Sequence, residues 1–255
     1  MDALDWFGLI LAGFGGGLVG SVAGLASLVS YPALLAVGLP PVTANVSNTV
    51  ALVFSSVGSV WGSRPELTGQ RARVRHLWYV AIAGGTTGAI LLLVTPSSSF
   101  ALVVPWLIGL ASLGILLPGR PVPLAPDPNR PVAHHPPSIV VMVCVYLVAV
   151  YGGYFGAGAG VLLLSILLIT TSERLARSNA MKNVLLGLAN GVAAVFFIAF
   201  GPVRWSAVLP LAIGFFAGGR LGPMVVRRAP AGPLRVLIAC CGLGLAVHLG
   251  IDAYG

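Results

Sequence analysis

Two short polar runs are set within long apolar stretches of this chain of 255 residues. The first run, TANVSNT, covers residues 43–49, and the second, SNAMKN, covers residues 178–183. Polar side chains inside membrane segments are energetically unfavourable and are usually functional. Because Asn and Ser side chains donate hydrogen bonds and Lys182 adds a full positive charge, the two runs together predict a binding site for a small anion.

Each polar run opens a long apolar segment that follows a glycine-rich one. Unpaired N–H groups and a partial positive charge at a helix N-terminus favour an anion, so we predict a substrate site between the two helix starts. The predicted substrate-binding residues are Asn45, Ser47, Asn48, Thr49, Asn179, Lys182, Asn183 and Asn190. The alternative interpretation is that these side chains only cap helices and join neighbouring helices by hydrogen bonds.

A few other residues have two interpretations. Ser55 and Ser56 could line the same pathway or only pack against a neighbouring helix. Arg220, in AGGRLG, could attract anions, although its long side chain more readily carries the charge to the membrane interface. The basic cluster at residues 64–75 is interpreted as an orientation signal and a contact for anionic lipids.

The composition places these residues in a membrane. Hydrophobic residues make up 57% of the chain and charged residues only 8%, whereas soluble domains carry about 25% charged residues. This excludes a water-soluble protein, and the apolar content excludes a disordered one. Basic residues outnumber acidic ones by 14 to 6, an excess that here indicates membrane orientation rather than nucleic-acid binding.

Uninterrupted apolar length predicts the helices that must position the polar runs. Two apolar blocks exceed thirty residues and are rich in glycine at their centres, so each is predicted to form two short helices joined at the glycines. The other six have the length of one helix. The eight blocks are 5–37, 42–61, 77–94, 100–118, 138–171, 178–200, 205–226 and 234–250.

The two halves of the chain resemble each other. An offset of 134 residues aligns the first polar run with the second, and an offset of 136 aligns Gly20 and Gly24 with Gly156 and Gly160. The sequence therefore predicts a first transmembrane repeat at 1–118, a proline-rich cytoplasmic connector at 119–137 and a second transmembrane repeat at 138–255.

The basic residues select a topology. Thirteen of the 14, all except Arg204, share one side of the membrane only if each glycine-rich block enters and returns. By the positive-inside rule that side is cytoplasmic, so both termini of this multi-pass protein are predicted outside the inner (plasma) membrane. The predicted fold is all-α and polytopic, with two inverted-topology repeats, each a glycine-rich helical hairpin plus three transmembrane helices, as in many secondary transporters.

The absence of some residue types from the apolar blocks makes several classes of function less favoured. The apolar blocks hold no internal Asp or Glu, so coupling through a carboxylate is disfavoured, and no metal-binding spacing or catalytic motif occurs. We predict no cofactor and no metal. The predicted partners are a small anionic substrate and the lipid bilayer, with no nucleic acid, and a homo-oligomer is compatible with the sequence. Cys144, Cys240 and Cys241 lie in apolar runs and are interpreted as buried hydrophobic residues.

Longer motifs resemble a known family. The first half holds GGGLVGSVAG followed by YPALLAVGLPPVTANVSNTVAL, and the second holds GGYFGAGAG followed by ERLARSNAMKNVLLGLANGV. This combination resembles the TauE/SafE family of sulfite exporters and organosulfonate permeases, which implies transport of sulfur-containing anions. The family's Lys-Asn pair with a second Asn seven residues on matches Lys182, Asn183 and Asn190. The first half has Asn45-Val46-Ser47-Asn48 in place of a Gly-Thr-Asn-Lys-like stretch, so it lacks the second lysine.

The sequence thus predicts a membrane permease for sulfite, thiosulfate or a sulfonate that works by alternating access between the repeats. Two alternatives stay open. The missing carboxylate also suits a passive anion channel. A membrane-embedded enzyme acting on a lipid or sulfur substrate could use Cys240 and Cys241 as thiols.

Overall fold

The computed structural model describes residues 1–116, 137–170 and 173–226, together with residues 240, 243–244, 246–251 and 253–254. Within these residues every regular element is helical, which confirms the all-α prediction. The elements are α1 (Ala3–Ala23), α2 (Ala26–Ala36), α3 (Pro41–Gly62), α4 (Arg64–Leu67), α5 (Arg71–Val94), α6 (Ser97–Leu116), α7 (Ile139–Tyr154), α8 (Ala159–Thr170), α9 (Leu175–Phe200) and α10 (Trp205–Val226).

The described helices have the length and surface of membrane spans. Four stretches are long and apolar enough to cross a membrane: α1, Val74–Val94 of α5, α9, and Trp205–Val225 of α10. A helix of 21 residues is about 31 Å long, close to the thickness of the hydrocarbon core. Large apolar side chains such as Leu4 and Phe200 are mostly exposed, as expected where lipid is the solvent. The predicted polytopic membrane protein is confirmed.

The first glycine-rich block folds into a hairpin of α1 and α2. Gly16 and Gly20 of α1 lie against Ser30 and Ala26 of α2, so the two helices run antiparallel. Gly24 joins them at a φ of +77°, a left-handed conformation that glycine adopts without steric strain.

The second glycine-rich block forms the corresponding hairpin of α7 and α8. It turns at Gly156 and Gly158, whose φ values are +76° and +78°. The returning helices α2 and α8 have 11 and 12 residues, about 16–18 Å, which is roughly half of a hydrocarbon core. Both glycine-rich blocks therefore fold into helical hairpins with a short second arm, which agrees with the predicted pair of short helices joined at the glycines.

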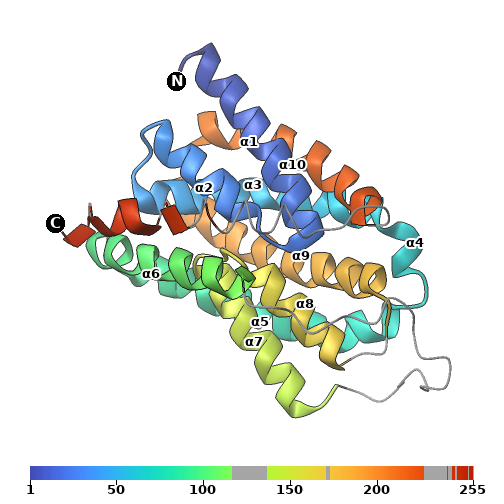
Figure 1. Ribbon diagram of the computed structural model, residues 1–255. Coiled ribbons are helices and arrows are strands. Elements are labelled where there is room, and N and C mark those ends of the chain that lie inside the picture. Colours follow the sequence, from blue (N-terminus) through green and yellow to red (C-terminus); the bar gives the residue numbers. More distant parts are fainter. Residues whose placement is uncertain are drawn as a thin grey trace.

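The two hairpins pack crosswise on the opposite halves of the chain. Close backbone contacts show that α1, α3 and α10 run parallel, that α5, α7 and α9 run parallel to one another, and that α3 crosses α9 antiparallel. In Figure 1, α1 and α10 lie side by side near one edge, α5 and α7 near the opposite edge, and α3 and α9 between them. The first hairpin thus rests on a helix of the second half, and the second hairpin on a helix of the first half. Equivalent helices run in opposite directions, as the inverted topology requires.

Equivalent contacts recur at a fixed spacing. Gly85 of α5 lies against the backbone of Ala189 in α9, and Gly219 of α10 lies against the backbone of Ser55 in α3. Both members of the first pair are 134 positions from their equivalents in the second. The structure therefore supports the predicted offset of 134 for the long helices.

The offset of 136 predicted for the hairpins is wrong. Gly84 of α5 lies against the carbonyl oxygen of Tyr146, and its equivalent Gly218 of α10 lies against the carbonyl oxygen of Phe14. Tyr146 and Phe14 are 132 residues apart. Gly24 therefore corresponds to Gly156, and both end the first helix of a hairpin in the left-handed conformation. Glycine matches arise by chance in a chain with 34 glycines, and such a match aligned Gly24 with Gly160.

The connector and the last predicted helix are described in part. Residues 119–136 lie outside the described residues, so the division into 1–118, 119–137 and 138–255 stays a prediction. The described residues at the C-terminal end pack on α6, where the Tyr254 hydroxyl donates to Leu102 O at 2.7 Å and accepts from Trp106 Nε1 at 2.9 Å.

The cysteines differ from the prediction of burial. Cys144 is partly buried, whereas Cys240 is exposed, and Cys241 lies outside the described residues. Burial was predicted from apolar surroundings, but in a membrane protein an apolar segment presents side chains to lipid as well as to the interior.

Candidate functional site

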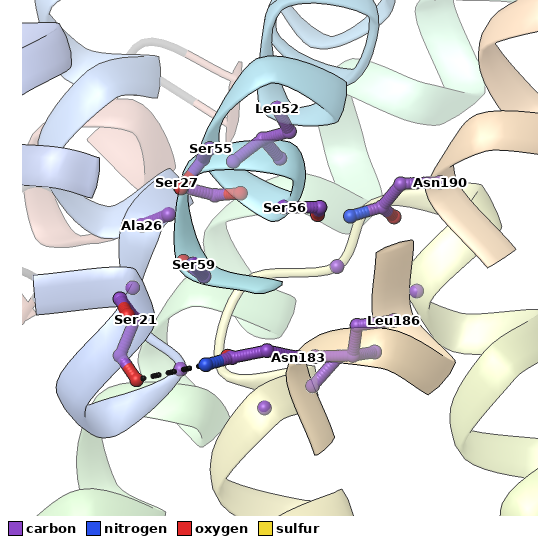
Figure 2. Close-up of a pocket in the computed structure, with 16 residues that line it drawn as sticks. Ser21, Ala26, Ser27, Leu52, Ser55, Ser56, Ser59, Asn183, Leu186 and Asn190 are labelled. Atoms are coloured by element: carbon purple, nitrogen blue, oxygen red, sulfur yellow. Dashed lines mark hydrogen bonds between the residues drawn. The ribbon is translucent and has the colours of Figure 1, made fainter. Parts of the chain in front are cut away.

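A polar cavity lies where the two hairpin elbows meet the middle of α3 and α9 (Figure 2). Its volume is about 50 Å³; a single water needs roughly 10–15 Å³ by the same measure, so the cavity has room for a few waters or a small anion. The hairpins contribute Gly20, Ser21, Gly24, Ala26, Ser27, Gly152, Gly156, Ala159 and Gly160, and the long helices contribute Leu52, Ser55, Ser56, Ser59, Asn183, Leu186 and Asn190.

The two elbows touch beside the cavity. A Cβ atom built on Gly24 would lie 2.3 Å from Gly160 Cα, and one built on Gly160 would lie 2.3 Å from Gly24 Cα. Only glycine at both positions allows the two backbones to approach this closely. The contact holds the starts of α2 and α8 together at the cavity wall.

The helix starts at the cavity belong to the short helices. Ala26 begins α2 and Ala159 begins α8, and both residues line the cavity. The long helices instead contribute residues from two or more turns inside their N-termini. The starts of α3 and α9 therefore do not line this cavity, and a substrate site between them stays a prediction. The unpaired N–H groups of a short helix carry the same partial positive charge, and the electrostatic argument for an anion therefore transfers to α2 and α8.

The polar side chains that line the cavity are neutral hydrogen-bonding groups. Five serines and two asparagines face it, and none of its described lining residues is charged. The Ser21 hydroxyl is buried and has no hydrogen-bond partner. Asn190 reaches from α9 toward Ser56 of α3 (Figure 2). These groups offer donors to a ligand that supplies acceptor oxygens.

Lys182 lies directly behind the cavity wall. Its side chain is fully buried, and Nζ donates to Gly20 O at 3.1 Å and to Ser21 O at 3.2 Å. In the described part of the chain no carboxylate pairs with it. The last carbonyls of a helix carry partial negative charge, so the C-terminus of α1 is what compensates this buried ammonium group.

Two asparagines of α9 share the same end of α1. Asn179 Nδ2 donates to Ser21 O at 2.9 Å, and Asn183 Nδ2 donates to that oxygen at 3.5 Å (Figure 2). Asn183 also lines the cavity, whereas Asn179 does not. The second polar run therefore caps α1 and reaches the cavity through Asn183.

The first polar run repeats half of this arrangement. Asn45 Nδ2 donates to Tyr154 O at 2.8 Å and so caps α7, as Asn179 caps α1. Asn48 occupies the position of Lys182 but bonds within its own half, donating to Ser27 Oγ at 3.1 Å and accepting from Ser30 Oγ at 2.6 Å. Only the second half thus places a charge at the end of a hairpin helix.

Ser47 and Thr49 form structural hydrogen bonds away from the cavity. Thr49 Oγ1 donates to Asn45 O, one turn earlier, at 3.0 Å. Ser47 Oγ accepts from the backbone N–H of Arg204 at 2.9 Å. Of the eight predicted residues, Asn183 and Asn190 line the cavity, and Lys182, Asn179 and Asn48 lie behind its wall, each bonded to a lining residue. The other three residues of the first run, Asn45, Ser47 and Thr49, do not line it.

Sequence reasoning missed several lining residues. Ser21 and Ser27 flank Gly24 but are single serines in an apolar hairpin, and Ser59 follows a run already rich in small residues. Their only signal is helical spacing, since Ser55 and Ser59 are one turn apart. Among the described residues, no three His, Cys, Asp or Glu side chains gather as a metal site would require.

The fold and the cavity together define a class. An all-helical membrane protein whose two inverted halves enclose a cavity with polar side chains, and whose hairpin elbows meet at that cavity, has the architecture of a secondary transporter. The chain belongs to the family described as Sulfite exporter TauE/SafE, whose family model matches residues 9–249.

Curated relatives of similar length carry transporter names. A probable membrane transporter protein, ORF9, of Sinorhizobium sp is 24% identical over 96% of this chain and 92% of its own length. The probable membrane transporter protein YfcA of Escherichia coli K12 is 25% identical over 98% of this chain and 90% of its own. A probable membrane transporter protein of Haemophilus influenzae is 24% identical over 86% and 84%. No solved structure matches the chain significantly.

Proposed function

We propose that this membrane transporter carries a small sulfur-containing oxyanion, of the sulfite, thiosulfate or sulfonate class, across the plasma membrane. The observation that carries the proposal is a cavity lined by neutral donors and two helix starts, with Lys182 buried behind one wall. A small oxyanion presents several acceptor oxygens to such donors. The family description supplies the sulfur chemistry.

The cavity residues divide into two roles in this proposal. Asn183, Asn190 and the serine hydroxyls bind the anion directly. Lys182 and Asn179 hold the C-terminal turn of α1, which carries Gly20 and Ser21 into the wall. Lys182 also offsets the partial negative charge of that turn, which would otherwise repel an anion.

Uptake into proteoliposomes tests the proposal. We expect labelled sulfite, thiosulfate or sulfoacetate to accumulate against its gradient when a driving gradient is supplied, and Asn190→Ala to weaken uptake about tenfold through the loss of one ligand hydrogen bond. Thr95→Val is the matched control, because Thr95 is outside the cavity and bonds only to its own helix. If the anion concentrations on the two sides only became equal, the protein would be a channel and not a carrier. If none of the three anions were taken up, the proposed substrate class would be contradicted.

Two partly buried contacts between a loop and the start of a long helix support alternating access. On one face, Gln70 Nε2 donates to Arg177 O at 2.9 Å and to Glu66 O at 2.8 Å, so it ties the α3–α5 loop to the start of α9. On the opposite face, the Arg204 N–H bond to Ser47 ties the α9–α10 loop to the start of α3. Positions 70 and 204 are 134 residues apart, and their partners Arg177 and Ser47 both lie in the first two turns of the equivalent helices α9 and α3. We propose that these two latches open in turn.

Removing one latch is expected to favour the conformation that is open to the face of that latch. Removing the other latch is expected to favour the conformation that is open to the opposite face. Gln70→Leu loses about 1–2 kcal/mol of hydrogen bonding, which changes the population ratio roughly 5- to 30-fold, and Ser47→Ala acts similarly on the other face. The measurement is labelling of a Ser59→Cys reporter, in a background without native cysteines, by an impermeant thiol reagent applied to each side.

A second cysteine reporter identifies which side of the membrane each labelling reaction takes place from. A Thr68→Cys variant marks the face of the basic cluster, because Thr68 is exposed in the loop between α4 and α5; with both termini outside, as we propose, it reacts only from the cytoplasmic side. Gln70→Leu should speed Ser59→Cys labelling from that side and Ser47→Ala from the other. A shift of both variants toward the same side would contradict the alternating latches.

A further inference from the structure

A second hollow lies between α3 and α9 on the outer surface of the helix bundle. Its volume is about 370 Å³, and its lining is almost entirely apolar. Along its length it is lined by Val53, Val57, Val60, Trp61, Val184, Gly187 and Leu188, with Ser56 against the substrate cavity and Arg64 at the far end. We call this hollow the α3–α9 groove.

The groove is open to the surroundings of the protein. Val57 is 52% exposed and Trp61 is 43% exposed, although both lie in a helix of a membrane protein. From Val53 to Arg64 the groove follows α3 for about 16 Å, roughly half of a hydrocarbon core. Its apolar part therefore matches the depth that a lipid acyl chain occupies in one leaflet.

Two arginines from different halves of the chain meet at the end of the groove. Arg64 Cζ lies 5.5 Å from the centroid of the Trp61 ring, and Arg220 Cζ lies 4.5 Å from it. In the described part of the chain no ion pair of Arg64 or Arg220 with a carboxylate occurs. Tryptophan and arginine are typical of the headgroup level of a membrane.

We propose that the α3–α9 groove binds one acyl chain of an anionic phospholipid, whose phosphate is held by Arg64 and Arg220 beside Trp61. The apolar walls fit the chain, and two guanidinium groups that pair with no carboxylate among the described residues fit a phosphate, which they contact through paired N–H donors. A second copy of the protein is a poorer occupant, because the whole chain holds only 6 acidic residues to meet these arginines.

The position of the groove gives the lipid a structural consequence. Ser56 lines both the groove and the substrate cavity, and a Cβ atom on Gly187 would lie 2.9 Å from Ser56 Cβ. Two small residues are thus the wall between the polar cavity and the hydrocarbon. An acyl chain in the groove would seal this wall, whatever the transported substrate is.

Native mass spectrometry of the purified protein tests the lipid site with phosphatidylglycerol and phosphatidylcholine of identical chains. We expect one phosphatidylglycerol to bind at least tenfold more tightly than phosphatidylcholine, and Arg64→Ala with Arg220→Ala to remove that preference. Arg174→Ala is the control, since Arg174 is exposed at the start of α9, outside the groove and outside the basic cluster at 64–75, and this variant should keep the preference. Arg64→Lys with Arg220→Lys preserves the charge and should also keep most of it.

Two results would overturn the lipid site. One is an unchanged preference for phosphatidylglycerol in the double alanine variant. The other is a dimer that persists after lipid removal and cross-links through Val57→Cys, because the groove would then hold a second copy. Val57→Trp fills the groove and should lower the binding of both lipids; full binding in this variant would also contradict the proposal.

Discussion

Replacing Lys182 with alanine is expected to lower the affinity for the transported anion about 10- to 150-fold, the equivalent of one hydrogen-bonded charge. Two effects act in the same direction. The positive charge behind the cavity disappears, and the carbonyl oxygens of Gly20 and Ser21 lose the donor that offsets their partial negative charge. The measurement is the concentration dependence of anion uptake, together with anion binding to the purified protein.

The internal repeat offers the control for Lys182. Asn48 occupies the equivalent buried position and bonds to two serines, but it carries no charge. Asn48→Ala should therefore lower the free energy of unfolding, and because Asn48 also bonds to the cavity residue Ser27, it should lower the anion affinity slightly but much less than Lys182→Ala. Lys182→Asn, which keeps a donor at the site without the charge, should lose affinity like Lys182→Ala. Wild-type uptake by a stably folded Lys182→Ala protein would remove Lys182 from the mechanism.

The fold could be predicted further than is usual from one sequence, because the bilayer restricts the choices. Apolar length gave the helices, and the basic residues distinguished a hairpin from a single crossing at each glycine-rich block. The hairpin register could not be predicted in the same way, since glycine is so frequent here that a shifted alignment matches almost as well. The left-handed conformations of Gly24 and Gly156, which only a structure reveals, identify the equivalent positions.

The sequence predicted the kind of side chains in the candidate site, but only some of the predicted residues line the cavity. A polar residue in an apolar helix marks an interior position, and all seven predicted residues from Asn45 to Asn183 are indeed buried. Sequence does not tell whether such a residue faces a cavity or the end of another helix. Asn45 and Asn179 turn to the carbonyl ends of α7 and α1, because the crosswise packing brings the hairpin of the other half against each long helix. Both the substrate hypothesis and the capping alternative thus describe part of the same run.

Replacing Gly24 with alanine is expected to damage the protein in two ways, because Gly24 combines a left-handed backbone with a close backbone contact. The left-handed conformation of Gly24 costs an L-residue about 1–2 kcal/mol, and the new Cβ would lie 2.3 Å from Gly160 Cα, a backbone atom that cannot rotate away. Overpacking of a rigid contact adds about 1–3 kcal/mol or more. We therefore expect a loss of roughly 2–5 kcal/mol in stability and no measurable transport, since the starts of α2 and α8 must separate.

The chain contains controls that separate the two parts of this effect. Gly38 has a φ of +83° but nothing within 4 Å of a built Cβ, so Gly38→Ala carries the conformational strain without the clash. Gly160 lies in α8 with an ordinary helical backbone but faces the same 2.3 Å contact, so Gly160→Ala carries the clash without the strain. Thermal unfolding in detergent should rank the losses as Gly24 first, Gly160 second and Gly38 last, with transport kept only in Gly38→Ala. If Gly38→Ala were as damaging as Gly24→Ala, backbone strain alone would explain the loss, and the contact between the elbows would not be what holds the cavity in shape.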